Sequence, residues 1–299
     1  MPSKILITGG TGLVGTRLTQ RLIEKKHKVS ILTTSAVKAE ENGAYYWNLK
    51  DKYIDSRAFD GVDYIIHLAG AGVADERWTK SRKKIIYDSR IANTRLLFER
   101  SKGHGIKGII AASGIGYYGM DTGDKWVDEG SDDGNDFLSN LVVDWEKAID
   151  SFGEIMERVV KLRIGVVLDH SGGALPKIAR PIRIGVGSPL GSGQQWISWI
   201  HVEDLVKMIL FAVENNLIGT YNAVAPNPVT NTEFTKAVAK RLGRSLWLPN
   251  APAFILKIVF GELAKVVLGG NRVKSNKIEK ESFSFEYSQL DAALADLLE

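Results

Sequence analysis

Cysteine is absent from this sequence, and so are the spacings typical of metal ligands. The first absence excludes disulfides, thiolate catalysis and cysteine-ligated zinc or iron–sulfur centres. Neither H-x-x-x-H nor H-E-x-x-H occurs, and no carboxylate cluster has ligand spacing, so we predict no catalytic metal. A Walker A sequence is also missing, which argues against a P-loop nucleotide site.

Long uncharged apolar runs are missing too. The most apolar stretch spans 253–268 and contains Lys257, Glu262 and Lys265, which argues against a membrane span. We interpret it as a helix with a broad apolar face, either part of the core or a subunit contact in a homodimer. The chain starts without the pattern of a signal peptide, so a cytoplasmic location is expected.

The charge of the chain is nearly balanced. Its 299 residues include 39 basic and 35 acidic side chains, and 39 − 35 gives the net charge of +4. The densest basic run, Lys80 to Lys84, is interpreted as a solvated helix face, so we predict no nucleic-acid partner. With 44% apolar and 25% charged residues, the composition is that of a globular protein of one large or two small domains.

Apolar periodicity predicts strands that alternate with helices. The expected strands cover 5–8, 29–32, 62–68, 106–112 and 159–168, and the expected helices cover 13–26, 85 to about 103, and 137–152. Such alternation implies right-handed crossovers and a parallel sheet with both faces covered. We therefore predict a doubly wound, Rossmann-type α/β fold.

The pattern changes after Leu168. Glycine- and proline-rich loops follow, and 226–299 is mainly helical with apolar patches. We predict a dinucleotide-binding domain made of 1–168 plus about 195–225. The remaining segments, 169–194 and 226–299, are predicted to form a smaller C-terminal lobe on the substrate side.

A glycine-rich turn joins the first strand to the first helix. Gly9, Gly12 and Gly15 have the spacing G-x-x-G-x-x-G, and Leu13 and Val14 open the helix. The glycines permit a tight turn, close approach of a pyrophosphate and close helix–strand packing, while the helix N-terminus offers free N–H groups. The turn predicts a dinucleotide site; the alternative is a turn that is merely tight.

The end of the second strand bears on the choice of cofactor. An acidic residue there is typical of NAD binding, and an arginine is typical of NADP binding. Here Thr33, Thr34 and Ser35 offer hydroxyl groups instead, and Lys38 adds a positive charge. This pattern favours NADP over NAD, although NAD stays open.

Several segments carry a family resemblance. They include ITGGTGLVG from Ile5, HLAGAGVADERW from His67, SGIGYYG from Ser113, RIGVVL from Arg163 and PLGSGQQWISWIHVEDL from Pro189. Together they resemble the extended short-chain dehydrogenases, in particular the branch labelled NAD-dependent epimerase/dehydratase-like or cell-division-inhibitor-like. The resemblance extends over essentially the whole chain.

The resemblance implies further cofactor contacts. Leu68, Ala69 and Gly70 would pass along the adenosine and ribose, Arg90 would contact the cofactor, and Gly165 with Val166 would lie near the nicotinamide. The chain departs from the pattern at Thr34, where members of this branch usually carry an arginine.

The catalytic set of the superfamily is incomplete. Its members usually use a serine with a Tyr-x-x-x-Lys pair, in which the lysine lowers the tyrosine pKa. Here Leu138 and Val142 stand at the tyrosine and lysine positions, and Gly114 stands at the serine position. Ser113 and Tyr117 are the substitutes that we predict to be catalytic. For Tyr117 a structural role is an equally weighted alternative, in which its ring stacks on the nicotinamide or packs at the interface between the lobes.

Two functions follow from these observations. The first is an NAD(P)-dependent oxidoreductase or epimerase-like enzyme that acts on a small polar substrate, with a sugar nucleotide as one candidate. The second is a non-catalytic dinucleotide-binding protein with a regulatory or interaction role, which the missing Tyr-x-x-x-Lys pair motivates.

Overall fold

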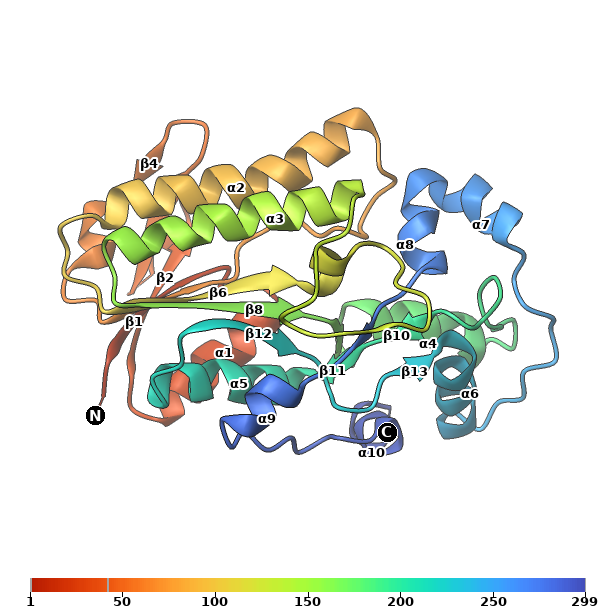
Figure 1. The fold of residues 1–299 in the computed structure, drawn as a ribbon. Coiled ribbons are helices and arrows are strands. Elements are labelled where there is room, and N and C mark those ends of the chain that lie inside the picture. Colours follow the sequence, from red (N-terminus) through yellow and green to blue (C-terminus); the bar gives the residue numbers. More distant parts are fainter. Residues whose placement is uncertain (1, 42, 299) are drawn as a thin grey trace.

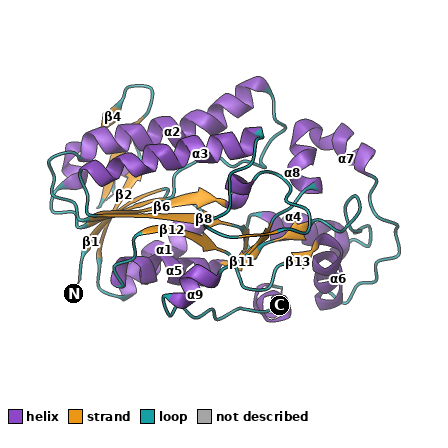
Figure 2. Ribbon diagram, viewed as in Figure 1, coloured by secondary structure: helices purple, strands orange, loops and turns teal. Residues whose placement is uncertain are grey.

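The computed structural model describes residues 2–41 and 43–298 and centres on an eight-stranded sheet (Figures 1 and 2). The strand order is β12-β8-β6-β5-β1-β2-β3-β4, and all neighbours are parallel except β3 and β4. The strands are β1 (Lys4–Thr8), β2 (Lys28–Thr33), β3 (Ala44–Asn48), β4 (Tyr53–Ile54), β5 (Tyr64–His67), β6 (Gly108–Gly114), β8 (Arg158–Ile164) and β12 (Gly219–Ala223). The predicted doubly wound parallel sheet is confirmed.

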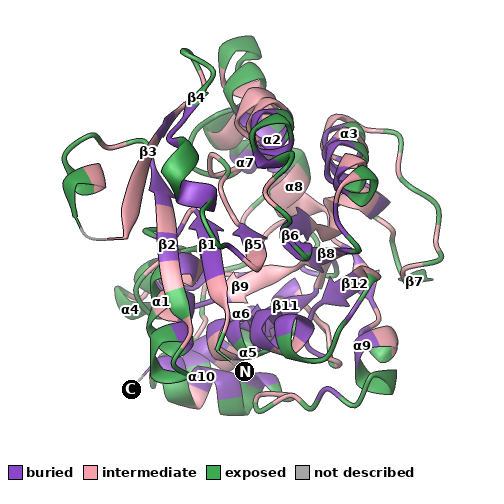
Figure 3. Ribbon diagram, turned by 90° about the vertical axis from the view of Figure 1, so that its left-hand side faces the viewer, coloured by how far each residue is buried: buried purple, intermediate pink, exposed green. Residues whose placement is uncertain are grey.

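Helices cover both faces of the sheet (Figure 1). On one face lie α1 (Leu13–Glu24) and α5 (Val202–Glu214), and on the other lie α2 (Lys80–Ser101) and α3 (Phe137–Asp150). Successive strand residues point to opposite faces, so Ile5 and Ile7 join one core cluster while Leu6 joins the other. The central strands are accordingly buried (Figure 3).

Most of the rest of the chain forms short paired strands and helices beyond the carboxyl ends of the large sheet, whereas the helix over 276–280 packs on the face that α1 and α5 cover, where Ile278 joins the core cluster of Ile5 and Ile7 (Figure 1). Three two-stranded sheets pair β9 (Val166–Leu168) with β11 (Trp199–His201), β10 (Trp196–Ile197) with β13 (Val229–Thr230), and β14 (Arg272–Val273) with β7 (Trp126–Val127). The helices are α4 (Ala174–Arg183), α6 (Asn231–Arg241), α7 (Ala253–Phe260), α8 (Ala264–Leu268), α9 (Asn276–Lys280) and α10 (Leu290–Leu297).

Five 3-10 helices link these elements: η1 (Lys38–Glu40), η2 (Ser56–Phe59), η3 (Ile115–Tyr118), η4 (Ser151–Glu154) and η5 (Gly261–Leu263). None of the helices in the described part of the chain is both long enough and apolar enough to cross a membrane.

Three sequence expectations differ from the structure. The strand expected over 159–168 is divided between β8 and β9, because the chain bends at Gly165, where a Cβ would lie 2.3 Å from Ser198 O. Of the eight strands of the large sheet, β3, β4 and β12 were not predicted. Helix α4 lies within a segment expected to be loop-rich; Pro176 fits there because it stands in the first turn, where an N–H has no intrahelical partner.

Candidate cofactor and substrate site

The glycine turn lies where the strand order reverses, between β1 and β5. Gly9 has φ +74°, and a Cβ there would lie 3.0 Å from Ala69 N. A Cβ at Gly15 would lie 2.1 Å from Gly9 O, so only glycine lets α1 approach the turn this closely. Ligands of doubly wound sheets bind in the crevice at such a reversal.

The first turn of α1 leaves backbone donors free. Gly12 is the N-cap residue, and no side chain of the described residues caps the helix. The first helical hydrogen bond is donated by Thr16 N to Gly12 O (2.9 Å), so the N–H groups of Leu13, Val14 and Gly15 have no partner within the described chain. The Leu13 side chain faces Gly172 before α4, where a Cβ would lie 3.1 Å from Leu13 Cδ1. These donors and the missing side chains fit a diphosphate.

The threonine hydroxyl groups at the end of β2 differ in solvent exposure. Thr33 is buried, and its Oγ1 accepts a hydrogen bond from Ser35 N (3.2 Å). Thr34 and Lys38 are exposed. Thr34 and Lys38 are therefore the side chains of this segment that are accessible to a ligand.

Arg90 lies against the end of β5. Its Nη1 donates to Ala71 O (2.9 Å), and a Cβ at Gly70 would lie 3.2 Å from its Cζ. Burial, together with the nearby Arg82, lowers the pKa of Arg90 to about 10. No carboxylate of the described residues pairs with Arg90, so its cation is available to an anionic ligand near Leu68, Ala69 and Gly70.

His67 connects the two strands at the reversal. The side chain is fully buried; its Nδ1 lies 2.6 Å from Thr8 Oγ1 and its Nε2 lies 2.9 Å from Thr94 Oγ1. Thr8 Oγ1 also accepts a hydrogen bond from Ala69 N (3.2 Å). This network fixes the turn after β1 relative to the chain after β5.

We expect His67 to make folding sensitive to acid. Burial, reinforced by Arg90, lowers the pKa of His67 from 6.5 to about 4. The unfolded chain therefore takes up this proton first, and stability is lost as the pH falls from 6.5 towards 4, by up to about 3 kcal/mol. Urea denaturation at several pH values should give a flatter profile for His67→Asn than for the wild type; equal slopes would contradict the assignment.

The two predicted catalytic residues flank a buried ion pair at the end of β6. Glu146 of α3 accepts from Arg163 of β8, with Nε at 2.8 Å from Oε1 and Nη2 at 2.9 Å from Oε2. Ser113 Oγ donates to the same Glu146 Oε1 (2.6 Å). The Arg163 guanidinium also lies over the Tyr117 ring, with Cζ 3.3 Å from the ring centroid. The ion pair thus holds both side chains in place.

The hydroxyl groups of this cluster have different surroundings. Tyr118 is buried and donates to Asn222 Oδ1 (2.7 Å); burial raises the pKa of Tyr118 to about 12. The Tyr117 side chain is half-buried, and its hydroxyl has no hydrogen-bond partner among the residues that the structure describes. Within the described chain the hydrogen-bonding capacity of the Tyr117 hydroxyl is therefore unused, whereas that of Tyr118 is taken up.

Helix α3 is apolar at Leu138 and Val142, the two positions where the resemblance to the superfamily predicts the Tyr-x-x-x-Lys pair. Leu138 packs closely on η3, since a Cβ at Gly116 would lie 2.7 Å from Leu138 Cγ. Val142 is buried. Neither side chain can transfer a proton.

Gly165 and Val166 stand where β8 gives way to β9. Gly165 N donates to Ala223 O (3.1 Å), and Val166 N donates to Ser198 O (2.8 Å). Gly165 and Val166 thus follow the carboxyl end of β8, two and three positions after Arg163, which is the register partner of Ser113 on the neighbouring strand.

A groove lies between the N-terminal ends of α2 and α3 and the α7–α8 segment. It consists of two pockets of about 320 Å³ and about 580 Å³ that share Met120, Asp136 and Lys265. Trp78, after β5, and Phe137, at the start of α3, line the smaller pocket. Across the described residues, no group of three or more His, Asp or Glu side chains could hold a metal ion.

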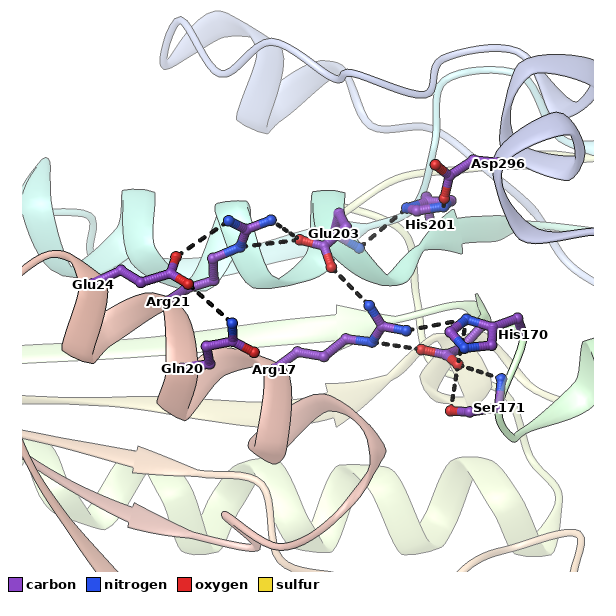
Figure 4. Close-up of polar contacts among 10 residues, drawn as sticks. Arg17, Gln20, Arg21, Glu24, His170, Ser171, His201, Glu203 and Asp296 are labelled. Atoms are coloured by element: carbon purple, nitrogen blue, oxygen red, sulfur yellow. Dashed lines mark hydrogen bonds and ion pairs between the residues drawn. The ribbon is translucent and has the colours of Figure 1, made fainter. Parts of the chain in front are cut away.

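Ion pairs fix the orientation of α1 (Figure 4). Arg17 Nη1 lies 2.9 Å from Glu203 Oε1 on α5, and Arg21 Nη2 lies 3.0 Å from Glu203 Oε2. Arg17 Nε also lies 2.8 Å from the buried Asp169, which follows β9. The helix that carries the glycine turn is therefore tied to both neighbouring elements.

His201 continues this network to the C-terminal helix (Figure 4). It is the N-cap of α5, and its Nδ1 accepts a hydrogen bond from Glu203 N (3.2 Å). Its Nε2 therefore carries the proton and faces Asp296 Oδ2 of α10 at 3.2 Å. The role of His201 is structural.

Sequence reasoning missed Glu146 and Arg163 as site residues. Their signal was present only in part: Glu146 lies on the apolar face of α3 and requires a partner, but β8 carries three basic residues, Arg158, Lys161 and Arg163, and its sequence does not single out Arg163. What the sequence did not show was that Ser113 and Arg163 are register partners on neighbouring strands.

The reversed strand order above a glycine turn defines a dinucleotide-binding protein of the extended short-chain dehydrogenase type. A family model described as the NAD dependent epimerase/dehydratase family matches residues 5–137, and a domain of unknown function (DUF1731) matches residues 251–297. An epimerase family protein of Staphylococcus aureus is 35% identical over 298 residues, which cover 98% of each chain. The chain belongs to this epimerase family.

Solved structures agree with this assignment. Human epimerase family protein SDR39U1 (isoform 2), crystallised with NADPH, has a TM-score of 0.88 and 31% identity over 98% of both chains. A UDP-glucose 4-epimerase of Thermotoga maritima, crystallised with UDP-glucose, has a TM-score of 0.78 at 20% identity, a likeness of fold alone. The family and the glycine turn both indicate a nicotinamide dinucleotide, NAD(P), as cofactor.

Proposed function

We propose that the protein is an NADP(H)-dependent oxidoreductase for a small polar substrate, with Tyr117 as the group that exchanges a proton with the substrate. The observation that carries this proposal is the Tyr117 hydroxyl, which is free of partners in the described chain while its ring is held by Arg163. A bound nicotinamide dinucleotide supplies or accepts the hydride.

The residues of the chain divide the remaining tasks. The N–H groups of Leu13, Val14 and Gly15 hold the diphosphate, and Arg90 adds positive charge beside Gly70. Tyr117 gives a proton to the substrate oxygen during reduction and takes it back during oxidation. Ser113 Oγ, whose hydrogen points to Glu146, can still accept a hydrogen bond from a substrate hydroxyl.

The preference for NADP rests on the end of β2. Thr34 and Lys38 are accessible there, and no carboxylate follows the strand directly, as NAD binding would favour. The human relative crystallised with NADPH supports the same choice. The substrate would place its reacting oxygen at Tyr117 and extend past Met120, which lies two residues after η3, into the groove beside α7–α8; a sugar nucleotide is one candidate.

The experiment that tests this proposal has a binding and a turnover arm. Calorimetry should give a dissociation constant for NADPH about tenfold below that for NADH, which corresponds to one charge-assisted hydrogen bond. NADPH oxidation should then be followed with a panel of aldehydes and ketones. Tyr117→Phe is expected to lower kcat by about 100-fold or more without changing NADPH affinity.

Tyr53→Phe is the matched control, because Tyr53 is exposed on β4, at the far edge of the sheet from β8. It should behave like the wild type. Equal turnover by Tyr117→Phe and the wild type would exclude Tyr117 as the proton-exchanging group, and tighter binding of NADH would exclude the NADP preference.

A second candidate function is a non-catalytic dinucleotide-binding protein with a regulatory or interaction role. Leu138 and Val142, at the positions of the usual catalytic pair, favour it. The same experiment decides between the two: NADPH binding without oxidation by any carbonyl compound in the panel would support the second function.

A further inference from the structure

Arg272, on the short strand β14, lines neither pocket of the groove. Its neighbours Asn271 and Val273 are buried, and Asn271 Nδ2 donates to Gly119 O (2.8 Å) and Ile115 O (3.1 Å). Since successive strand residues point to opposite sides, Arg272 points away from η3. Its side chain is half-buried rather than covered.

Two tryptophans hold the Arg272 guanidinium. Its Cζ lies 4.2 Å from the ring centroid of Trp126 on β7 and 3.9 Å from that of Trp196 on β10. The Trp196 ring is itself fixed, because its Nε1 donates to Asp124 Oδ1 (3.0 Å). The guanidinium is therefore held in a defined orientation before any ligand binds.

The guanidinium has no acceptor in the described chain, 2–41 and 43–298: it makes no hydrogen bond and no ion pair there, and its Nε is buried without a partner. Other arginines on aromatic rings differ. Arg163 is paired with Glu146, and Arg158, over Tyr64, donates to Ala212 O (2.5 Å). Arg272 thus combines an oriented cation with unused donors.

The geometry restricts what can bind there. The two indole rings pack against the guanidinium. Of its three nitrogens only Nε is buried without a partner, which leaves the Nη donors for a ligand. A guanidinium edge matches the oxygens of a carboxylate or phosphate, which it can bind through two parallel hydrogen bonds. We propose that Arg272, between Trp126 and Trp196, is a binding site for a small oxyanion, separate from the cofactor crevice.

This site is close to the substrate groove without belonging to it. Gly269, three residues before Arg272, lines the larger pocket, and Thr122 N donates to Gly270 O (3.0 Å). Residues 269–272 therefore connect the two sites: Gly269 borders the groove, and an anion would bind at Arg272, three residues further along the chain. The phosphate or carboxylate would come from a small molecule that is not the cofactor.

The test uses protein saturated with NADPH, so that the glycine turn is already occupied. Inorganic phosphate and succinate are titrated separately by calorimetry, which distinguishes a phosphate site from a carboxylate site. The wild type should bind at least one of the two with one equivalent per chain. Arg272→Met should weaken that binding at least tenfold, and Arg272→Lys, which retains the charge and loses the planar edge, should give an intermediate loss.

Arg183→Met is the matched control, because Arg183 is an exposed arginine at the end of α4. It should leave anion binding within twofold of the wild type, and all variants should retain wild-type NADPH affinity. Two results would overturn the proposal: a wild type that binds neither anion at millimolar concentration, or an Arg272→Met variant that binds as well as the wild type. If the wild type binds no anion and Arg272→Met lowers the melting temperature, the packing of Arg272 against Trp126 and Trp196 has a purely structural role.

Discussion

Replacing Gly12 by aspartate is expected to abolish cofactor binding and leave the fold intact. Gly12 is an N-cap residue with φ −82° and ψ 178°, a conformation that aspartate adopts readily, and aspartate is a favoured N-cap. Its carboxylate would, however, occupy the free N–H groups that a diphosphate needs and repel its charge. Affinity for NADPH should fall by about 100-fold or more, since a charge-assisted hydrogen bond is worth about 1.5–3 kcal/mol.

Calorimetry with NADPH, together with thermal melting, measures both parts of this expectation. The melting temperature should stay level or rise slightly, because a capped helix is more stable than an uncapped one. Gly12→Asn is the matched control, since asparagine has a similar size and caps equally well without the charge. A Gly12→Asp variant that binds NADPH like the wild type would place the cofactor elsewhere.

Replacing Arg163 by methionine is expected to lower the free energy of unfolding by about 3–5 kcal/mol. The change leaves the buried Glu146 carboxylate with Ser113 and the more distant Lys161, whose Nζ lies 3.8 Å from Glu146 Oε2. A buried charge without a partner is strongly destabilising, whereas replacing both partners of a buried ion pair by uncharged residues often changes the stability little. Urea denaturation measures the difference.

The double variant Arg163→Met with Glu146→Gln should recover much of this loss, because no charge is then stranded. As a control, Arg21→Met removes an exposed ion pair with Glu203 and should change stability by less than about 1 kcal/mol. Losses of equal size in the single and double variants would show that packing, rather than charge, makes Arg163 important.

The part of the fold that depends on local pattern was predictable. The alternation of apolar strands and amphipathic helices indicated the doubly wound sheet, and the glycine spacing indicated its ligand-binding turn. Strands β3 and β4 escaped prediction because they are short strands near one edge of the sheet, rich in aromatic and polar residues and without a clear period of two. Helix α4 escaped because its two prolines resemble a loop signal.

The candidate site was only partly predictable, because some of its residues meet through tertiary contacts and not through local sequence. Ser113 and Tyr117 are close in sequence and follow one strand, so their placement at its end was a local inference. Glu146 and Arg163 come from α3 and β8, and their meeting depends on strand order and register. No local pattern contains that information, so the partner that holds both side chains emerged only from the tertiary structure.

The strand order also has a consequence for the synthesis of the chain. Strand β12 is the last of the eight to leave the ribosome, and it pairs with β8, which would otherwise be an edge. Any nascent or truncated chain that stops before Gly219 exposes the unpaired backbone of the seven-residue strand β8. Such an edge is a template for aggregation, so protection from misassembly depends on a strand that arrives after more than two-thirds of the chain is made.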